Sequence, residues 1–226
     1  MTTVVITGAN RGIGLSLVKH YLAKNYQVHA TYRSQGHASE LFKLESPNLH
    51  CHQLDVTNYA RYETLSSQLP EIDILINNAG YYGPKGYVFG ETDIEEWRKV
   101  MEINTIAPMK LVEALYPNLE RGSLKKIACI SSKMGSMGDN TSGGAYIYRS
   151  SKAALNSVVK SLSNDLASQG FTVLALHPGW VLTDMGGPNA RITTETSAMG
   201  LIEVIESATA DNSGEFINFD GSPLPW

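Results

Sequence analysis

The chain has 226 residues, 42% of them hydrophobic, and a formal net charge of −4 at pH 7. A chain of this length can bury one large α/β core or two small ones, and a single domain is the simpler interpretation. Its acidic and basic residues are scattered, which leaves no basic stripe to bind a nucleic-acid backbone or an anionic membrane surface, so neither partner is expected.

Strand-like and helix-like segments alternate along the chain, a pattern typical of a parallel sheet covered on both faces. The expected strands are short and β-branched, and in chain order they are Thr3–Thr7, Gln27–Tyr32, Leu49–Asp55, Asp73–Asn78, Lys126–Ser132, Thr172–His177 and Glu215–Phe219. Between them lie amphipathic windows long enough for crossover helices, for example Gly12–Lys24, Ile94–Leu119 and Ala145–Ser168. No linker, repeat or low-complexity tract divides the chain. We therefore expect one α/β domain over residues 1–226, with a doubly wound, mainly parallel sheet of seven strands between two layers of helices.

Glycine-rich stretches follow four of the expected strands: TGANRGIG, NAGYYGPKG, KMGSMGDNTSGG and PGWVLTDMGG. Ligands bind at the carboxyl ends of the strands in open parallel sheets, so these loops should converge on one crevice. The first stretch places Gly8, Gly12 and Gly14 between a strand and a helix. Glycine permits a tight turn, and the helix start offers free N–H groups to a pyrophosphate. Such a turn can also be a plain connection, but its strand and helix context favours a dinucleotide site.

The end of the second strand bears on which dinucleotide is bound. An NAD site usually places a carboxylate there to bind the ribose 2′-OH, whereas this strand ends in Tyr32 and Arg33 with no acid. Arg11, inside the glycine turn, is a second cation that could reach a 2′-phosphate. Either arginine alone could be a solvated surface charge. Together they favour NADP(H) over NAD(H).

The stretch AYIYRSSKAALN contains a candidate for proton transfer. On a helix, Tyr148 and Lys152 lie one turn apart, whereas Tyr146 faces Ser150. A free tyrosine has a pKa of about 10, and a neighbouring ammonium favours its phenolate, so the pair can shuttle a proton near neutral pH. Tyr146 is expected to be a pocket-wall or surface aromatic, and Arg149 is left as a supporting residue.

Several motifs together resemble the short-chain dehydrogenases/reductases. They are the TGANRGIG turn, the NNAG sequence Asn77–Gly80, the Y-x3-K pair and the dipeptide Pro178-Gly179, in the order of that family and spanning nearly the whole chain. More narrowly, YRSSKAALN, HPGWVLTDMGG and the ending DGSPLPW are similar to a branch with sniffer-type carbonyl reductases and bacterial C-factor or C-signal proteins.

The resemblance implies a Rossmann fold and nicotinamide-dependent carbonyl reduction or alcohol oxidation. It makes Tyr148 the proton donor, Lys152 its activator, Ser132 the group that polarises the substrate oxygen, and Asn104 the holder of a water linking Lys152 to solvent. Ser136 is the alternative serine, although both hydroxyls could merely tie down the loop. Expected cofactor contacts are Gly8, Asn10, Arg11, Gly12, Ile13, Gly14, Arg33, Asp55, Val56, Asn78, Ala79, Gly80, Tyr148, Lys152, Pro178, Gly179, Val181 and Thr183.

The substrate loops of the family lie after the fourth, fifth and sixth strands, and here they carry Tyr81, Tyr82, Met134, Met137, Trp180 and Met185. This lining suits an apolar or aromatic small-molecule carbonyl compound, although the same residues could be core or interface. The leading interpretation is therefore an NADPH-dependent reductase of aldehydes, ketones or quinones. The alternative is an NADP(H)-binding signalling or redox-sensor protein of C-factor type; a Rossmann-fold epimerase or dehydratase is disfavoured by the short C-terminal part.

The sequence also supports expectations about the location of the protein, its cysteines and histidines, its oligomeric state and Trp226. No signal peptide or membrane span is recognisable, and Cys51 and Cys129 lie in apolar segments, so buried thiols and a cytoplasmic location are expected. The six histidines form no metal-ligand spacing, and His177 should pack at a strand end. The sequence itself does not reveal the oligomeric state, but many members of the family that it resembles pair through the two long helices, here Ile94–Leu119 and Ala145–Ser168, so a homodimer or homotetramer is a candidate assembly. Trp226 looks exposed and could pack on a neighbour or on its own domain.

Overall fold

The computed structural model describes residues 1–226 and confirms the seven-stranded sheet. Its order is β3-β2-β1-β4-β5-β6-β7, and every neighbouring pair of strands is parallel. The strands are β1 (Thr3–Ile6), β2 (Gln27–Tyr32), β3 (Leu49–Gln53), β4 (Ile74–Asn77), β5 (Lys126–Ile130), β6 (Thr172–His177) and β7 (Phe216–Asn218). Several of them are slightly shorter than predicted.

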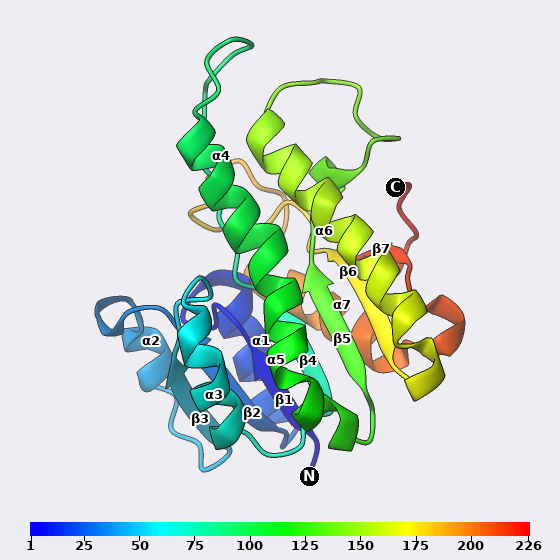
Figure 1. Ribbon diagram of the computed structural model, residues 1–226. Coiled ribbons are helices and arrows are strands. Elements are labelled where there is room, and N and C mark those ends of the chain that lie inside the picture. Colours follow the sequence, from blue (N-terminus) through cyan, green and yellow to red (C-terminus); the bar gives the residue numbers. More distant parts are fainter.

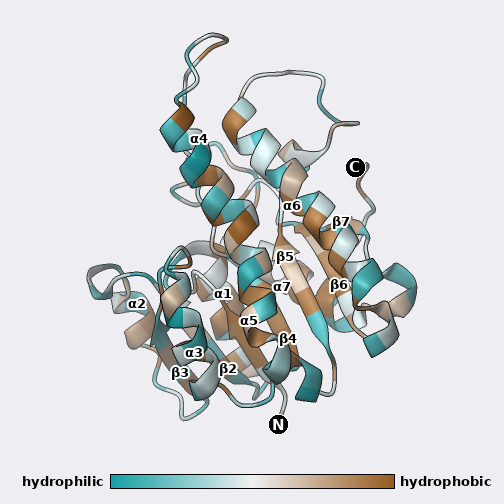
Figure 2. Cartoon of the chain, viewed as in Figure 1, coloured by the Kyte–Doolittle hydropathy of each residue, from teal (hydrophilic) through white to brown (hydrophobic).

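Helices cover both faces of the sheet and make three layers (Figure 1). One hydrophobic cluster joins the sheet to α1 (Gly12–Ala23), the short α2 (Ser39–Phe42) and α7 (Thr194–Ser207); the other joins it to α3 (Tyr62–Gln68), α5 (Ala107–Arg121) and α6 (Tyr146–Asp165). Alternate residues of each strand enter opposite clusters, because successive side chains of a strand point to opposite faces. Val4 and Ile6 belong to the first cluster and Val5 to the second. Figure 2 shows the resulting concentration of hydrophobic residues in the strands.

The helix predicted over Ile94–Leu119 is interrupted in the structure. It consists of α4 (Ile94–Met101), a π-helical turn at Glu102–Ile106 and then α5. Pro108, in the first turn of α5, has no N–H to donate to the carbonyl four residues earlier, that of Asn104, and this favours a local change of hydrogen-bond register. The Asn104 side chain is completely buried at this turn.

The strand order changes direction between β1 and β4, which marks the position of the ligand crevice in a doubly wound sheet. The loops that follow β4, β5 and β6 gather at the end of the sheet opposite the N-terminus (Figure 1). The loop after β1 lies at the same end, because all the strands are parallel, so the four glycine-rich loops expected to line one crevice share one end of the sheet.

The two cysteines differ in exposure, which corrects part of the prediction. Both are free thiols, as expected, but only Cys129 is buried. Cys51 is exposed because β3 is an edge strand that lacks a neighbour on its outer side. Trp226 packs on its own domain, with its ring stacked on Phe216 at 5.6 Å between centroids. None of the helices combines the length and the apolar character needed to cross a membrane.

Candidate active site

The glycine turn and the NNAG loop pack directly against each other. Gly8 has a positive φ of 63°, and a Cβ there would lie 2.9 Å from the Cα of Ala79. At Gly14, a Cβ would lie 2.3 Å from the Gly8 carbonyl oxygen, which excludes any side chain. The Asn78 side-chain amide donates to the carbonyls of Thr7 and Gly8 at 2.8 and 3.1 Å. These contacts fix the glycine turn against the NNAG loop at the point where the strand order of the sheet reverses.

The start of α1 has the properties of an anion site. Its N-cap, Arg11, makes no side-chain capping bond, and the first turn contains no acidic residue. The Asn10 amide donates to the His37 carbonyl at 2.8 Å and orders the turn from the side. Opposite, Thr183 approaches Gly12 so closely that a Cβ on this glycine would lie 3.3 Å from the threonine methyl carbon. The free helix N-terminus and the side-chain-free cradle fit the pyrophosphate of a dinucleotide.

The two arginines expected to select the dinucleotide lie at the exposed rim of this crevice. Arg33 is exposed at the end of β2. Arg11 donates to the Asp184 carboxylate at 2.6 Å, and both side chains are largely exposed. An exposed ion pair of this kind stabilises a protein by about 0–1 kcal/mol, so it is easily exchanged for a ligand phosphate. Asp55 receives hydrogen bonds from the backbone N–H and hydroxyl of Thr57, which shape the turn after β3.

Tyr148 lies in the first turn of α6 and is 7% exposed. Its ring stacks on that of Tyr82, with 4.5 Å between centroids and 25° between planes. Burial raises the pKa of the Tyr148 phenol, a hydrogen bond with Ser132 opposes this shift, and Tyr82 adds to it. The Tyr148 phenol is therefore neutral at neutral pH.

Lys152 is buried one helical turn after Tyr148, as the spacing predicted. Its Nζ donates to the Ile130 carbonyl at 2.8 Å and lies 5.8 Å from the centroid of the Tyr148 ring. Burial lowers the pKa of this ammonium to about 8, and Cys129 acts in the opposite direction. The group stays mainly protonated at neutral pH, so a buried positive charge lies near the Tyr148 ring.

Four serines lie between β5 and α6, and the three that come first in the sequence have different environments. Ser132 is buried. Its hydroxyl oxygen accepts a 3.2 Å hydrogen bond from the Met134 N–H, which is its single hydrogen bond with a backbone group. Ser131 donates to the Asn156 side chain and is thereby used in packing. Ser136 accepts from the Asp139 N–H at 3.0 Å and donates to the Trp226 carbonyl at 3.4 Å, which are loop-ordering contacts. This arrangement is consistent with Ser132 as the serine of the site.

Asn104 performs a task that the sequence did not predict. Its Oδ1 accepts from the Tyr81 N–H and its Nδ2 donates to the Tyr81 carbonyl, both at 2.8 Å. The same Nδ2 donates to the Ser151 hydroxyl at 3.0 Å. Asn104 thus clamps the loop after β4 to α6. The water that this residue was expected to hold stays a prediction.

The aromatic residues of the substrate loops separate into two groups. Tyr82 covers Tyr148, whereas the Tyr81 hydroxyl donates to Glu96 on α4 and directs that side chain away from the site. Trp180 and Met185 are 48% and 39% exposed on the loop after β6. Lys85 joins the two loops, because its Nζ donates to the Met185 carbonyl at 2.9 Å. Met137 is 76% exposed and lies at the outer rim.

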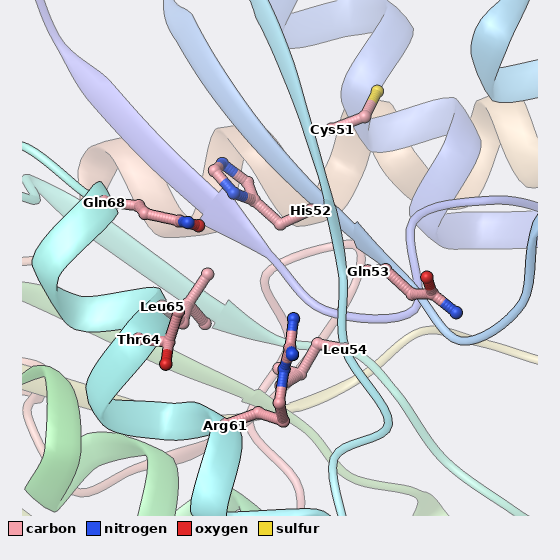
Figure 3. A pocket seen from close by; sticks show the side chains of 8 residues that line it. All are labelled: Cys51, His52, Gln53, Leu54, Arg61, Thr64, Leu65 and Gln68. Carbon is pink, nitrogen blue, oxygen red and sulfur yellow. The ribbon is translucent and has the colours of Figure 1, made fainter.

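A cavity of about 130 Å³ lies between the edge strand β3 and helix α3, outside this site (Figure 3). Its lining includes His52, Arg61 and Gln68, but none of the residues predicted for cofactor or catalysis. His177 packs at the end of β6 as predicted, and burial lowers its pKa to about 4. No group of three or more histidine, cysteine, aspartate or glutamate side chains is arranged to hold a metal ion.

Comparisons with known proteins agree with this geometry. Residues 2–192 match the model of the short chain dehydrogenase family. The chain is 43% identical over 155 residues to the protein named C-signal of Myxococcus xanthus, an alignment covering 69% of this chain and 93% of that protein. Its structure superimposes on the carbonyl reductase Sniffer of D. melanogaster with a TM-score of 0.95, 35% identity and complete coverage of both chains. An NADPH-bound carbonyl reductase from chicken fatty liver gives a TM-score of 0.93 and 36% identity, over 100% of this chain and 99% of the other.

Proposed function

The chain belongs to the short-chain dehydrogenase family, and from this premise we propose that it is an NADPH-dependent oxidoreductase that reduces the carbonyl group of an aldehyde, ketone or quinone to an alcohol. The observation that carries the proposal is the buried pair of Tyr148 and Lys152 beside Ser132. These groups lie at the same end of the sheet as the glycine turn, because all follow the carboxyl ends of parallel strands.

NADP(H) is the dinucleotide that fits the crevice best. The start of α1 would hold the pyrophosphate, and Arg11 and Arg33 would bind a 2′-phosphate by charge-assisted hydrogen bonds. The absence of an acid at the end of β2 leaves the ribose 2′-OH of NAD(H) without its usual partner. The NADPH bound to the chicken carbonyl reductase supports the same choice. When bound, the nicotinamide supplies the hydride that adds to the carbonyl carbon.

The protein supplies the proton and the charge that the reaction needs. The Ser132 hydroxyl would bind the carbonyl oxygen and draw electron density toward it. Tyr148 would transfer its phenolic proton to this oxygen as the hydride arrives, which completes the alcohol and leaves a phenolate. Lys152 would stabilise that phenolate, since its buried ammonium lies over the phenol ring. Proton return from solvent then restores Tyr148.

The mouth of the site favours an apolar or aromatic substrate. Tyr82, Trp180 and Met185 supply flat and polarisable surfaces, and the latter two are partly exposed. An open mouth suits several related carbonyl compounds rather than a single one.

The proposal is tested by following NADPH oxidation with a panel of aldehydes, ketones and quinones, alongside the same panel with NADH. We expect turnover with NADPH, and we expect Tyr148→Phe to abolish it while NADPH still binds. Tyr146→Phe is the matched control, because this exposed residue lies on the same helical turn and contacts Phe89 instead of Tyr148. Equal turnover by the unmodified protein and Tyr148→Phe would remove Tyr148 from the mechanism.

A second candidate function rests on the likeness to C-signal. In this alternative the protein binds NADP(H) and its output is an interaction with a partner rather than turnover. It predicts NADPH binding without oxidation by any carbonyl of the panel, and an output that Tyr148→Phe leaves intact. The buried Tyr148–Lys152 pair favours the enzyme, because a pure binding module has no need of a lysine buried beside a phenol.

A further inference from the structure

The helical turn that carries Tyr148 lacks a cap of its own. The N-cap of α6, Ala145, has no side-chain oxygen and adopts a left-handed conformation with φ of 46°. Two glycines with positive φ, Gly143 and Gly144, precede it and have open space around them. A helix start of this kind leaves N–H groups unpaired and the first turn prone to fraying. Something other than the sequence of α6 must hold Tyr148 in place.

The loop after β4 provides that support. The Tyr87 hydroxyl oxygen accepts a 2.9 Å hydrogen bond from the Ile147 N–H, which replaces the missing cap one residue before Tyr148. Tyr82 stacks on the Tyr148 ring itself. Gly83 packs between α4 and α6, because a Cβ there would lie 2.8 Å from a methyl carbon of Val100 and 3.6 Å from one of Ile147. The loop therefore fits closely against the start of α6.

The same loop is fastened on both sides of Tyr82. Before Tyr82, the Asn104 side chain makes two 2.8 Å hydrogen bonds with the Tyr81 backbone. After it, Lys85 donates to the Met185 carbonyl at 2.9 Å, and its ammonium lies 5.3 Å from the centroid of the Tyr82 ring. A fastened aromatic ring can restrict a neighbouring ring, whereas a loose one cannot.

We propose that Tyr82 and Tyr87 are positioning residues for proton transfer, Tyr82 by stacking on the ring of Tyr148 and Tyr87 by capping the helical turn that carries it. The Tyr148 ring is then restrained by Tyr82, with Lys152 also over it, and its hydroxyl edge can face the carbonyl. Proton transfer depends steeply on such placement, since small displacements of a reacting group can cost orders of magnitude in rate. The kinetic part of this inference rests on the proposed reductase function.

Four variants separate positioning from general stability. Tyr82→Leu removes the flat ring, Tyr82→Phe retains it, and Tyr87→Phe removes only the hydroxyl that caps Ile147. Tyr146→Phe is the control on the same turn. We expect Tyr82→Leu and Tyr87→Phe to lower kcat about five- to tenfold, with the KM for NADPH unchanged. Tyr82→Phe should restore nearly full kcat, because stacking needs the ring and not the hydroxyl.

An NMR measurement tests the contact without turnover. The Tyr148 ring signal, in a protein with 11 tyrosines, is assigned by its loss in Tyr148→Phe. Shielding by the stacked Tyr82 ring should place this signal upfield, and Tyr82→Leu should move it downfield, whereas Tyr146→Phe should not.

The outcomes distinguish this inference from the proposed function. An unmoved Tyr148 signal in Tyr82→Leu overturns the stacking contact. A signal that moves while kcat stays unchanged in both Tyr82→Leu and Tyr87→Phe overturns the positioning role. If Tyr82→Leu does not fold, Tyr87→Phe against Tyr146→Phe decides the kinetic question, since both substitutions remove one hydroxyl. Failure of every carbonyl to be reduced refutes the reductase, while the NMR result still decides the contact.

Discussion

His29 is expected to make the protein sensitive to acid. It is 3% exposed in β2, its Nδ1 lies 3.0 Å from Nε2 of His52, and its ring stacks on His50 at 4.7 Å between centroids. Its own Nε2 is buried without a partner. Burial lowers the pKa of His29 to about 3, and the neighbouring histidines add to this effect. The folded protein therefore keeps this imidazole neutral at a pH where the unfolded chain protonates it.

The sign and size of the effect follow from proton linkage. An unperturbed histidine has a pKa of about 6.5, so below that pH the unfolded state binds the additional proton. The stability contributed by the neutral imidazole is complete above about pH 6.5 and is lost as the pH falls toward the folded value of about 3. Between about pH 7.5 and about pH 5 the free energy of unfolding should decrease by about 2 kcal/mol through His29 alone.

The assay is urea denaturation of the unmodified protein and of His29→Phe at these two pH values. Phenylalanine preserves an aromatic ring for stacking on His50 but cannot titrate. We expect the pH-dependent loss of stability to be smaller in the variant by about 2 kcal/mol, and to be unaltered in His37→Gln, which changes an exposed histidine. Acid sensitivity that remains is expected from the half-buried His177, whose pKa is lowered to about 4, and from His52, whose pKa burial also lowers. Equal losses in His29→Phe and the unmodified protein would refute the assignment to His29.

Three further predictions concern the crevice and its clamp. Arg33→Ala and Arg11→Ala should each weaken NADPH binding about 10- to 100-fold and leave NADH binding nearly unchanged in a fluorescence titration; a parallel loss for both dinucleotides would argue against 2′-phosphate recognition. Gly14→Ala should abolish NADPH binding, because its Cβ would lie 2.3 Å from a carbonyl oxygen, whereas Gly36→Ala, with open space around it, should bind normally. Asn104→Ala should lower the free energy of unfolding by about 1–3 kcal/mol in urea, since it leaves the Tyr81 backbone unpaired; an unchanged midpoint would contradict the clamp.

The sheet could be predicted from the sequence because its strands are short apolar segments separated by helical windows. The residues at which strands end could not be predicted as well, because a strand ends where its paired strand in the sheet ends. The strand expected over Leu49–Asp55 ends at Gln53, because its partner β2 ends at Tyr32. The exposure of Cys51 was missed for a related reason: a local sequence does not reveal which strand lies at the edge of a sheet.

The site could be predicted where its residues share one helix or one turn. Helical spacing alone brings Lys152 next to Tyr148, and the glycine pattern alone indicates the anion-binding turn. The role of Arg149 needed the fold, in which its guanidinium donates to the Met134 carbonyl and the Ser142 hydroxyl and so ties the serine loop to α6. Contacts of this kind join segments whose approach no local pattern encodes.

At the π-helical turn around Asn104, the sequence contained a local signal for a disturbed helix but did not indicate what the disturbance does. Pro108 lies four residues after Asn104, and a missing N–H at that distance leaves a carbonyl without its helical partner. That signal predicts a disturbed helix, but not its purpose, because the same proline could simply begin a helix. The function of the turn depends on Tyr81, in the loop after β4, because the buried Asn104 side-chain amide forms hydrogen bonds with the backbone N–H and carbonyl of Tyr81. The π-helical turn between α4 and α5 and the position of the loop after β4 against α6 therefore depend on the same side chain, that of Asn104.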